Sequence, residues 1–197
     1  FTFYYKEDKN KCYVSIKPNQ LEEIYLLSLT RQSGDGYQFD GSSMLGEFPF
    51  YFNKMGERVQ LIIKNTKFRA DPDSAISRAL SSHVPNSIIS SGGIESSPHP
   101  ETGAILVDAK NFFIYDISNV TNRTGGKYKL DKENCSYNYI HSYPMNSEID
   151  VLLSFSSSKP QRRFTLASSK NMLHKYHISI SVLPKSEYKP RIADDRV

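Results

Sequence analysis

The sequence lacks tryptophan altogether and has only two cysteines among its 197 residues, Cys12 and Cys135. It has no CxxC pair and no Cys/His group at zinc-ligand spacing, so it carries no common signature of a structural zinc site or a dithiol redox centre. Cys12 falls on the apolar side of a strand pattern, so we expect a buried free thiol there. A disulfide with Cys135 stays open, because it requires the fold to bring the two residues together.

Long apolar runs and clusters of one charge are also missing. No stretch reaches 18 apolar residues, so we expect no membrane span. The formal net charge is +4, and lysine and arginine are scattered without a run of five basic residues. Because nucleic-acid binding requires a concentrated basic face, we expect no nucleic-acid partner.

The motifs that usually carry enzyme chemistry are absent as well. There is no GxSxG nucleophile elbow, and residues 41–46 have the glycine spacing of a phosphate-binding loop without the following Lys-Ser/Thr pair. His174 and His177 form an HxxH pair, but residues three apart on a strand point to opposite faces and cannot share a metal ion. We therefore expect two partly exposed strand histidines, and we assign no catalytic, cofactor-binding or metal-binding residue to this chain.

What the sequence does contain is repeated alternation of apolar and polar residues, the pattern of half-buried strands in antiparallel sheets. Residues 148–155 place four apolar side chains on one face: Ile149, Val151, Leu153 and Phe155. Further strands are expected at 12–17, 22–30, 87–96, 104–107, 137–143, 163–167 and 175–183, with a hairpin inside 48–69. We predict a mainly β fold, either an antiparallel sandwich or a large curved (saddle-like) sheet.

Helical signals are sparse and predict one or two short helices. Asp71 is a suitable N-cap and Pro72 a suitable first residue for a helix that ends before residue 85. Its apolar stripe consists of Ile76, Ala79 and Leu80. A second helix is expected at 109–115, whereas the polar segment 121–133 is predicted to be a mobile loop.

The composition changes abruptly near the end of the sequence. After Leu183 the chain has two prolines and dense charge, which is typical of an extended linker. We predict a β-rich domain over 1–183 and a junction over 184–197. Because the chain begins within a strand pattern and without methionine, we expect it to be a piece of a larger protein.

Several motifs resemble a family of large bacterial zinc-dependent metallopeptidases. In that family a poorly characterised β-rich domain ends in an LP…PR..D.RVG pattern just before the peptidase domain. The matching segments here are Leu183-Pro184, Pro190-Arg191 and 194–197. Other stretches agree in order: 21–27, 87–91, 105–116 and 143–155.

The resemblance implies a non-catalytic N-terminal domain that packs against the peptidase domain of the same polypeptide and helps to shape its substrate cleft. The family's HExGHxxGxxH motif lies in the next domain and does not occur here, so zinc is expected there and no cofactor in this chain. The possible interdomain junction residues are Pro184, Pro190, Arg191, Asp194 and Arg196. The resemblance also implies a peptide or protein substrate and a periplasmic or extracellular location.

Three hypotheses remain open. An accessory domain predicts an exposed apolar docking surface. A free-standing β-sandwich module that binds carbohydrate or a protein surface predicts exposed aromatic residues among Tyr4, Tyr13, Tyr37, Tyr137 and Tyr139. An independent hydrolase requires a cleft in which a Ser, a His and an Asp from distant positions come within hydrogen-bond reach.

Overall fold

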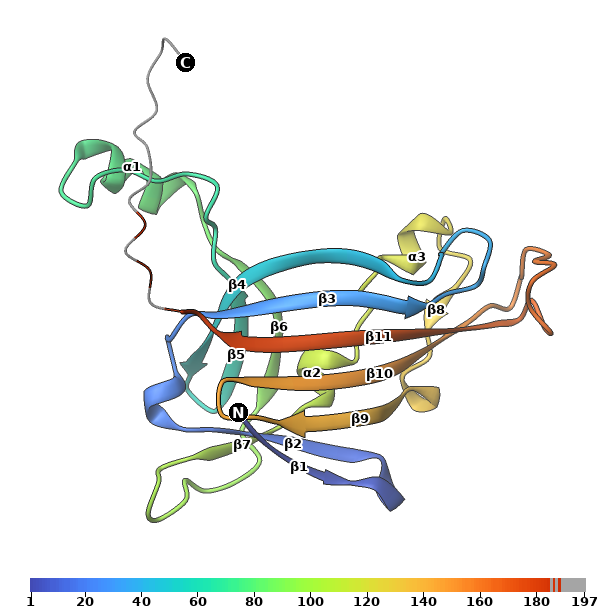
Figure 1. Ribbon diagram of the computed structural model, residues 1–197, viewed down its shortest axis with the longest axis horizontal. Helices are drawn as coiled ribbons and strands as arrows, with labels where there is room; N and C mark the ends of the chain where they lie inside the picture. The colour runs from blue at the N-terminus through green and yellow to red at the C-terminus, as the bar shows by residue number, and fades with distance from the viewer. Residues whose placement is uncertain (185, 187, 189–197) are drawn as a thin grey trace, which may run out of the picture.

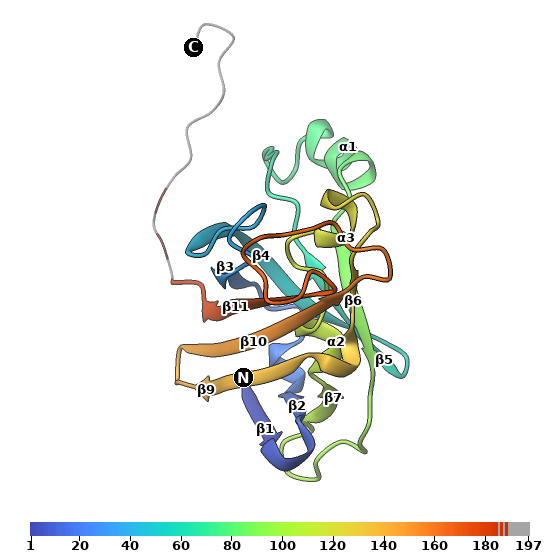
Figure 2. The same cartoon turned by 90° about the vertical axis from the view of Figure 1, so that its right-hand side faces the viewer.

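One strongly curled antiparallel sheet dominates the computed structural model, which describes residues 1–184, 186 and 188 (Figures 1 and 2). Its strand order is β6-β5-β4-β3-β11-β10-β8, and β9 pairs with β10 beside β8. The strands are β3 (Tyr25–Ser33), β4 (Ser43–Met55), β5 (Arg58–Ile63), β6 (Ser87–Gly93), β8 (Lys129–Leu130), β9 (Ser136–Ser142), β10 (Asn146–Ser156) and β11 (Asn171–Val182). The result is a half-barrel with one concave face.

A second, three-stranded antiparallel sheet lies below the half-barrel in Figure 1. It has the order β1-β2-β7 and contains β1 (Thr2–Lys6), β2 (Lys11–Ile16) and β7 (Ile105–Asp108). The α-helices are α1 (Ala75–His83), α2 (Lys110–Phe113) and α3 (Val120–Arg123), and short 3₁₀ turns occupy Glu7–Lys9, Pro18–Gln20 and Lys132–Asn134. No described helix has the length and apolar character needed to cross a membrane.

Irregular pairing accounts for the curl of the large sheet. The register shifts where β3 meets β4, where β11 meets β3, and in the pairs β5–β6 and β9–β10. Such bulges bend a strand and increase its twist. At the β3–β4 bulge Gly46 has φ +133°, and a Cβ atom there would lie 2.8 Å from the Phe48 ring, so this position requires glycine.

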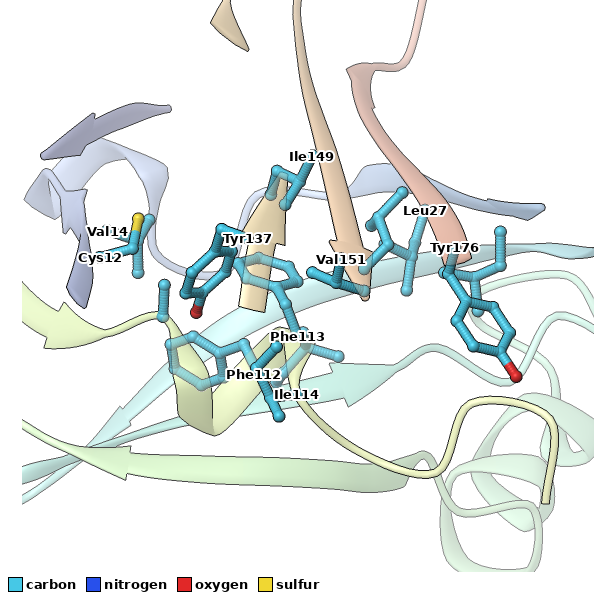
Figure 3. Close-up of a cluster of buried hydrophobic side chains, with 14 of the residues drawn as sticks. Cys12, Val14, Leu27, Phe112, Phe113, Ile114, Tyr137, Ile149, Val151 and Tyr176 are labelled. Carbon is cyan, nitrogen blue, oxygen red and sulfur yellow. The ribbon is translucent and has the colours of Figure 1, made fainter. Parts of the chain in front are cut away.

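The core fills the concave face, and α2 joins the two sheets within it. Figure 3 shows Phe112, Phe113 and Ile114 of α2 gathered with side chains of β2, β9 and β10. The Phe112 ring lies 5.1 Å from that of Phe52 on β4, and Phe113 lies 6.0 Å from Phe3 on β1. Each fully buried phenylalanine contributes about 1.5–3 kcal/mol, so this short helix is a main source of cohesion between the sheets.

The sequence predictions of fold class and of most strands are confirmed. The fold is mainly β, in the form of a large curved antiparallel sheet, and the predicted inward face of β10 is fully buried. The period-two pattern succeeded because each of these strands has one face in the core and one face outside.

Four local predictions are wrong. Residues 163–167 form a turn rather than a strand, because Arg163 points inward to an ion pair with Asp35. The segment 121–133 is not a loop throughout, since it contains part of α3 and all of β8. Helix α1 starts later than predicted and is capped by Ser74 instead of Asp71. The helix α3 is a third one, beyond the one or two expected.

Candidate functional site

The connection between β5 and β6 is much longer than an antiparallel pair requires. Residues 64–86 leave the sheet, form α1 and return to pair beside β5, and we call this segment the α1 excursion. Its base is closed by Asn65, whose backbone N–H donates to Asn86 Oδ1 (2.9 Å) and whose side chain donates to the Pro85 carbonyl (3.3 Å). In both views α1 projects beyond the sheet (Figures 1 and 2).

Helix α1 is amphipathic but packs against nothing in the described part of the chain. Ser74 Oγ accepts a hydrogen bond from the Ser77 N–H (3.0 Å) and caps the first turn. No α1 residue is buried, and Ile76, the first member of the predicted apolar stripe, is 65% exposed. Because an isolated helix of nine residues is only marginally stable in water, α1 is the element of this fold that most needs a partner.

Neighbouring apolar side chains share this exposure. Phe68, within the excursion, is 62% exposed, and Ile88 and Ile89 on the following strand β6 are also exposed. The sequence analysis did not single out these three residues. The adjacent Ile88-Ile89 pair was an available signal, since consecutive strand residues face opposite ways and an edge strand cannot bury both.

The outer face of β10 and β11 holds the densest group of charged residues. His177 lies between two carboxylates, with Nε2 2.8 Å from Glu148 Oε2 and Nδ1 2.7 Å from Asp150 Oδ1. Lys175 Nζ lies 2.9 Å from Asp150 Oδ2. Burial opposes ionisation of Asp150, but hydrogen bonds from His177 and Lys175 outweigh it and hold its pKa below the ordinary value.

This group does not have the geometry of a hydrolase triad. Ser179 Oγ donates to Glu148 Oε1 (2.9 Å), and both His177 ring nitrogens face carboxylates. A triad requires a histidine nitrogen that accepts the serine proton. Across the described residues, no group of three or more His, Cys, Asp and Glu side chains could hold a metal ion.

A second polar group lies inside one end of the half-barrel. Asp35 is paired with Arg163 and accepts hydrogen bonds from three successive backbone N–H groups at residues 37–39. His174 is fully buried nearby, its Nδ1 3.2 Å from the Tyr176 hydroxyl. Burial lowers the pKa of His174 to about 4, so its ring is neutral near pH 7. These groups have no route to a substrate, and their role is to hold loops together.

The two predicted histidines therefore have different environments. They point to opposite faces, as predicted, but only His177 is partly exposed, and the prediction of partial exposure is wrong for His174. Cys12 and Cys135 are both free and buried, and burial raises the pKa of the Cys12 thiol to about 12. The predicted buried thiol at Cys12 is thus confirmed.

The five candidate tyrosines do not form one row. Tyr4 and Tyr13 lie side by side across β1 and β2. Tyr37 and Tyr139 are exposed at other places, whereas Tyr137 is buried. Of the predicted junction residues, Pro184 is exposed, and Pro190, Arg191, Asp194 and Arg196 lie outside the described residues.

Comparison with known proteins gives one match. The profile of a family described as "Domain of unknown function (DUF5117)" matches residues 42–197. Neither a curated protein nor a solved structure matches the chain.

Proposed function

This chain belongs to the DUF5117 family, and from that premise we propose that it is a non-catalytic N-terminal domain of a zinc-dependent metallopeptidase. In this proposal the chain packs against the peptidase domain of the same polypeptide and helps to shape the cleft that receives a peptide or protein substrate. The order of motifs that resemble that peptidase family, from residue 21 to the end of the chain, supports this proposal.

The observation that carries the proposal is the unpartnered helix α1. Its apolar stripe has nothing to cover it among the described residues, although the same chain buries its other apolar stripes completely. A helix of this length gains most of its stability from packing, so an α1 conserved as a helix in the working protein requires an outside surface. A neighbouring domain, held close by the chain itself, supplies such a surface at high effective concentration.

The proposal assigns all chemistry to the neighbour. The zinc ion, its histidine ligands and the general base belong to the next domain, where zinc activates water for attack on the peptide bond. This chain contributes shape and support, and the polypeptide works in the periplasm or outside the cell.

The whole polypeptide that contains this chain provides the test. We expect it to bind about one zinc ion per molecule and to cleave peptides, whereas residues 1–197 alone do neither. The variant Ile76→Glu places a charge in the proposed contact and should lower peptidase activity several-fold. Ser81→Glu introduces the same side chain on the opposite face of α1 and should leave activity within about twofold, since exposed substitutions cost little.

Two results would contradict the proposal. A whole polypeptide without zinc and without peptidase activity would remove the metallopeptidase assignment. Equal activity of the Ile76→Glu and Ser81→Glu variants would show that α1 does not contact the catalytic domain.

A further inference from the structure

The outer face of the three-stranded sheet combines aromatic rings, hydroxyls and lysines. The alternation that buries Cys12 and Val14 turns the residues between them outward. Pairing of β1 with β2 places Tyr4 opposite Tyr13 and Lys6 opposite Lys11, with Thr2 opposite Ser15. Two tyrosines therefore lie between a pair of lysines and a pair of hydroxyl groups.

This face is hollowed in two places that meet at Tyr4. The larger hollow, of about 600 Å³, lies between the sheet and the segment 96–104, which contributes Ser96, Ser97, His99 and Thr102. The smaller, of about 450 Å³, is lined by three lysines: Lys6, Lys9 and Lys11. Since both share Tyr4, an extended ligand can occupy them in sequence.

The charge of the two hollows is one-sided. Four lysines line them (Lys6, Lys9, Lys11 and Lys17), and of the described residues no aspartate or glutamate does. Lys6 and Lys11 have acidic neighbours, at 3.7 Å and 4.0 Å, but these pairs are exposed and therefore weak. Lys9 and Lys17 form no ion pair within the described part of the chain. The surface thus favours an anionic ligand.

The aromatic and hydroxyl groups narrow the class of ligand. Tyr4 is 56% exposed although it lies beside a packed sheet, so its ring face is available for stacking. Sugar rings present an apolar C–H face to such a ring, while their hydroxyls suit serine and threonine partners. Carboxylate or sulfate substituents form charge-assisted hydrogen bonds with lysine. An acidic peptide would use the lysines but would have little need of the exposed tyrosine ring.

We propose that this face binds an anionic polysaccharide, whose sugar rings stack on Tyr4 and whose carboxylate or sulfate groups pair with the surrounding lysines. This site lies on elements other than the α1 excursion and does not depend on the peptidase assignment. Its failure and the failure of that assignment are therefore separate results.

Calorimetric titration of the full chain tests the site with defined probes. Heparin supplies sulfate groups, polygalacturonate supplies carboxylates, dextran is neutral, and polyglutamate carries charge without sugar. We expect binding to at least one of the two anionic polysaccharides, weakened by salt, and none to dextran. Tyr4→Ala should weaken binding about tenfold or more, and Lys9→Gln should weaken it less.

Matched variants on other surfaces serve as controls. Tyr139→Ala and Lys129→Gln remove an exposed tyrosine and an exposed lysine elsewhere and should leave the affinity unchanged. Absence of binding to both anionic polysaccharides would overturn the proposal. Binding of polyglutamate with equal affinity, or binding that Tyr4→Ala does not weaken, would also overturn it, because either result would mean that charge alone is recognised.

Discussion

Asp35 and Arg163 show how a few polar residues organise one end of the half-barrel. They lie 128 positions apart, and both side chains are almost fully buried. Buried ion pairs stabilise only when their remaining polar atoms are also satisfied. Asp35 meets this condition through three backbone donors and Arg163 partly meets it through Gln38, whose Oε1 lies 2.9 Å away. The pair thereby fixes the loop after β3 against the loop before β11.

The buried His174 makes a specific prediction about acid stability. Its pKa falls from an ordinary 6.5 to about 4 on folding, mainly because burial disfavours the charged ring. The unfolded chain therefore binds the proton more readily, and stability is complete above pH 6.5 and is lost as the pH falls toward 4. The loss amounts to roughly 3 kcal/mol at about 1.4 kcal/mol per pKa unit.

Urea unfolding at a series of pH values measures this loss. We expect the His174→Gln variant to have a flatter profile between pH 6.5 and 4, because it has no proton to gain there. His83→Gln removes an exposed histidine and should keep the original slope. A His174→Gln profile parallel to that of the unaltered chain would mean that this histidine does not carry the acid sensitivity.

At the scale of elements, the closest approach in the fold is that of β6 to β7 and α2. A Cβ atom on Gly92 would lie 2.6 Å from Val107 Cγ1 and 2.9 Å from Asn111 Nδ2, whereas one on the adjacent Gly93 meets nothing within 4 Å. We expect Gly92→Ala to lower the free energy of unfolding by about 1–3 kcal/mol through overpacking. Gly93→Ala is the matched control, and thermal unfolding compares the two. Equal melting temperatures would contradict this account of the β6 contact.

The elements that the sequence predicted best are those whose pattern is local. Strands β10 and β11 follow from alternation alone, because each has one buried and one exposed face. The turn at 163–167 could not be predicted in this way, since its structure depends on the distant Asp35. The segment 121–133 likewise looks polar, yet Tyr128 within it is fully buried and its hydroxyl donates to the Ser169 carbonyl (2.6 Å).

At the scale of the whole molecule, the sequence predicted a β-rich body but not its form. The curl depends on bulges whose positions the alternation does not reveal. The apolar stripe of α1 was visible in the sequence, but a stripe does not tell which surface covers it. The candidate contact at Phe68, Ile76 and Ile88 therefore emerged only when the fold left these residues exposed.

The central claim is that α1 is a docking element for a neighbouring catalytic domain. Hydrogen exchange of the α1 backbone amides, measured in residues 1–197 alone and in the whole polypeptide, tests it most directly. We predict rapid exchange in the chain alone and exchange slowed by about tenfold or more in the whole polypeptide, while the β11 amides are slow in both. Equal α1 exchange in the two proteins would contradict the claim.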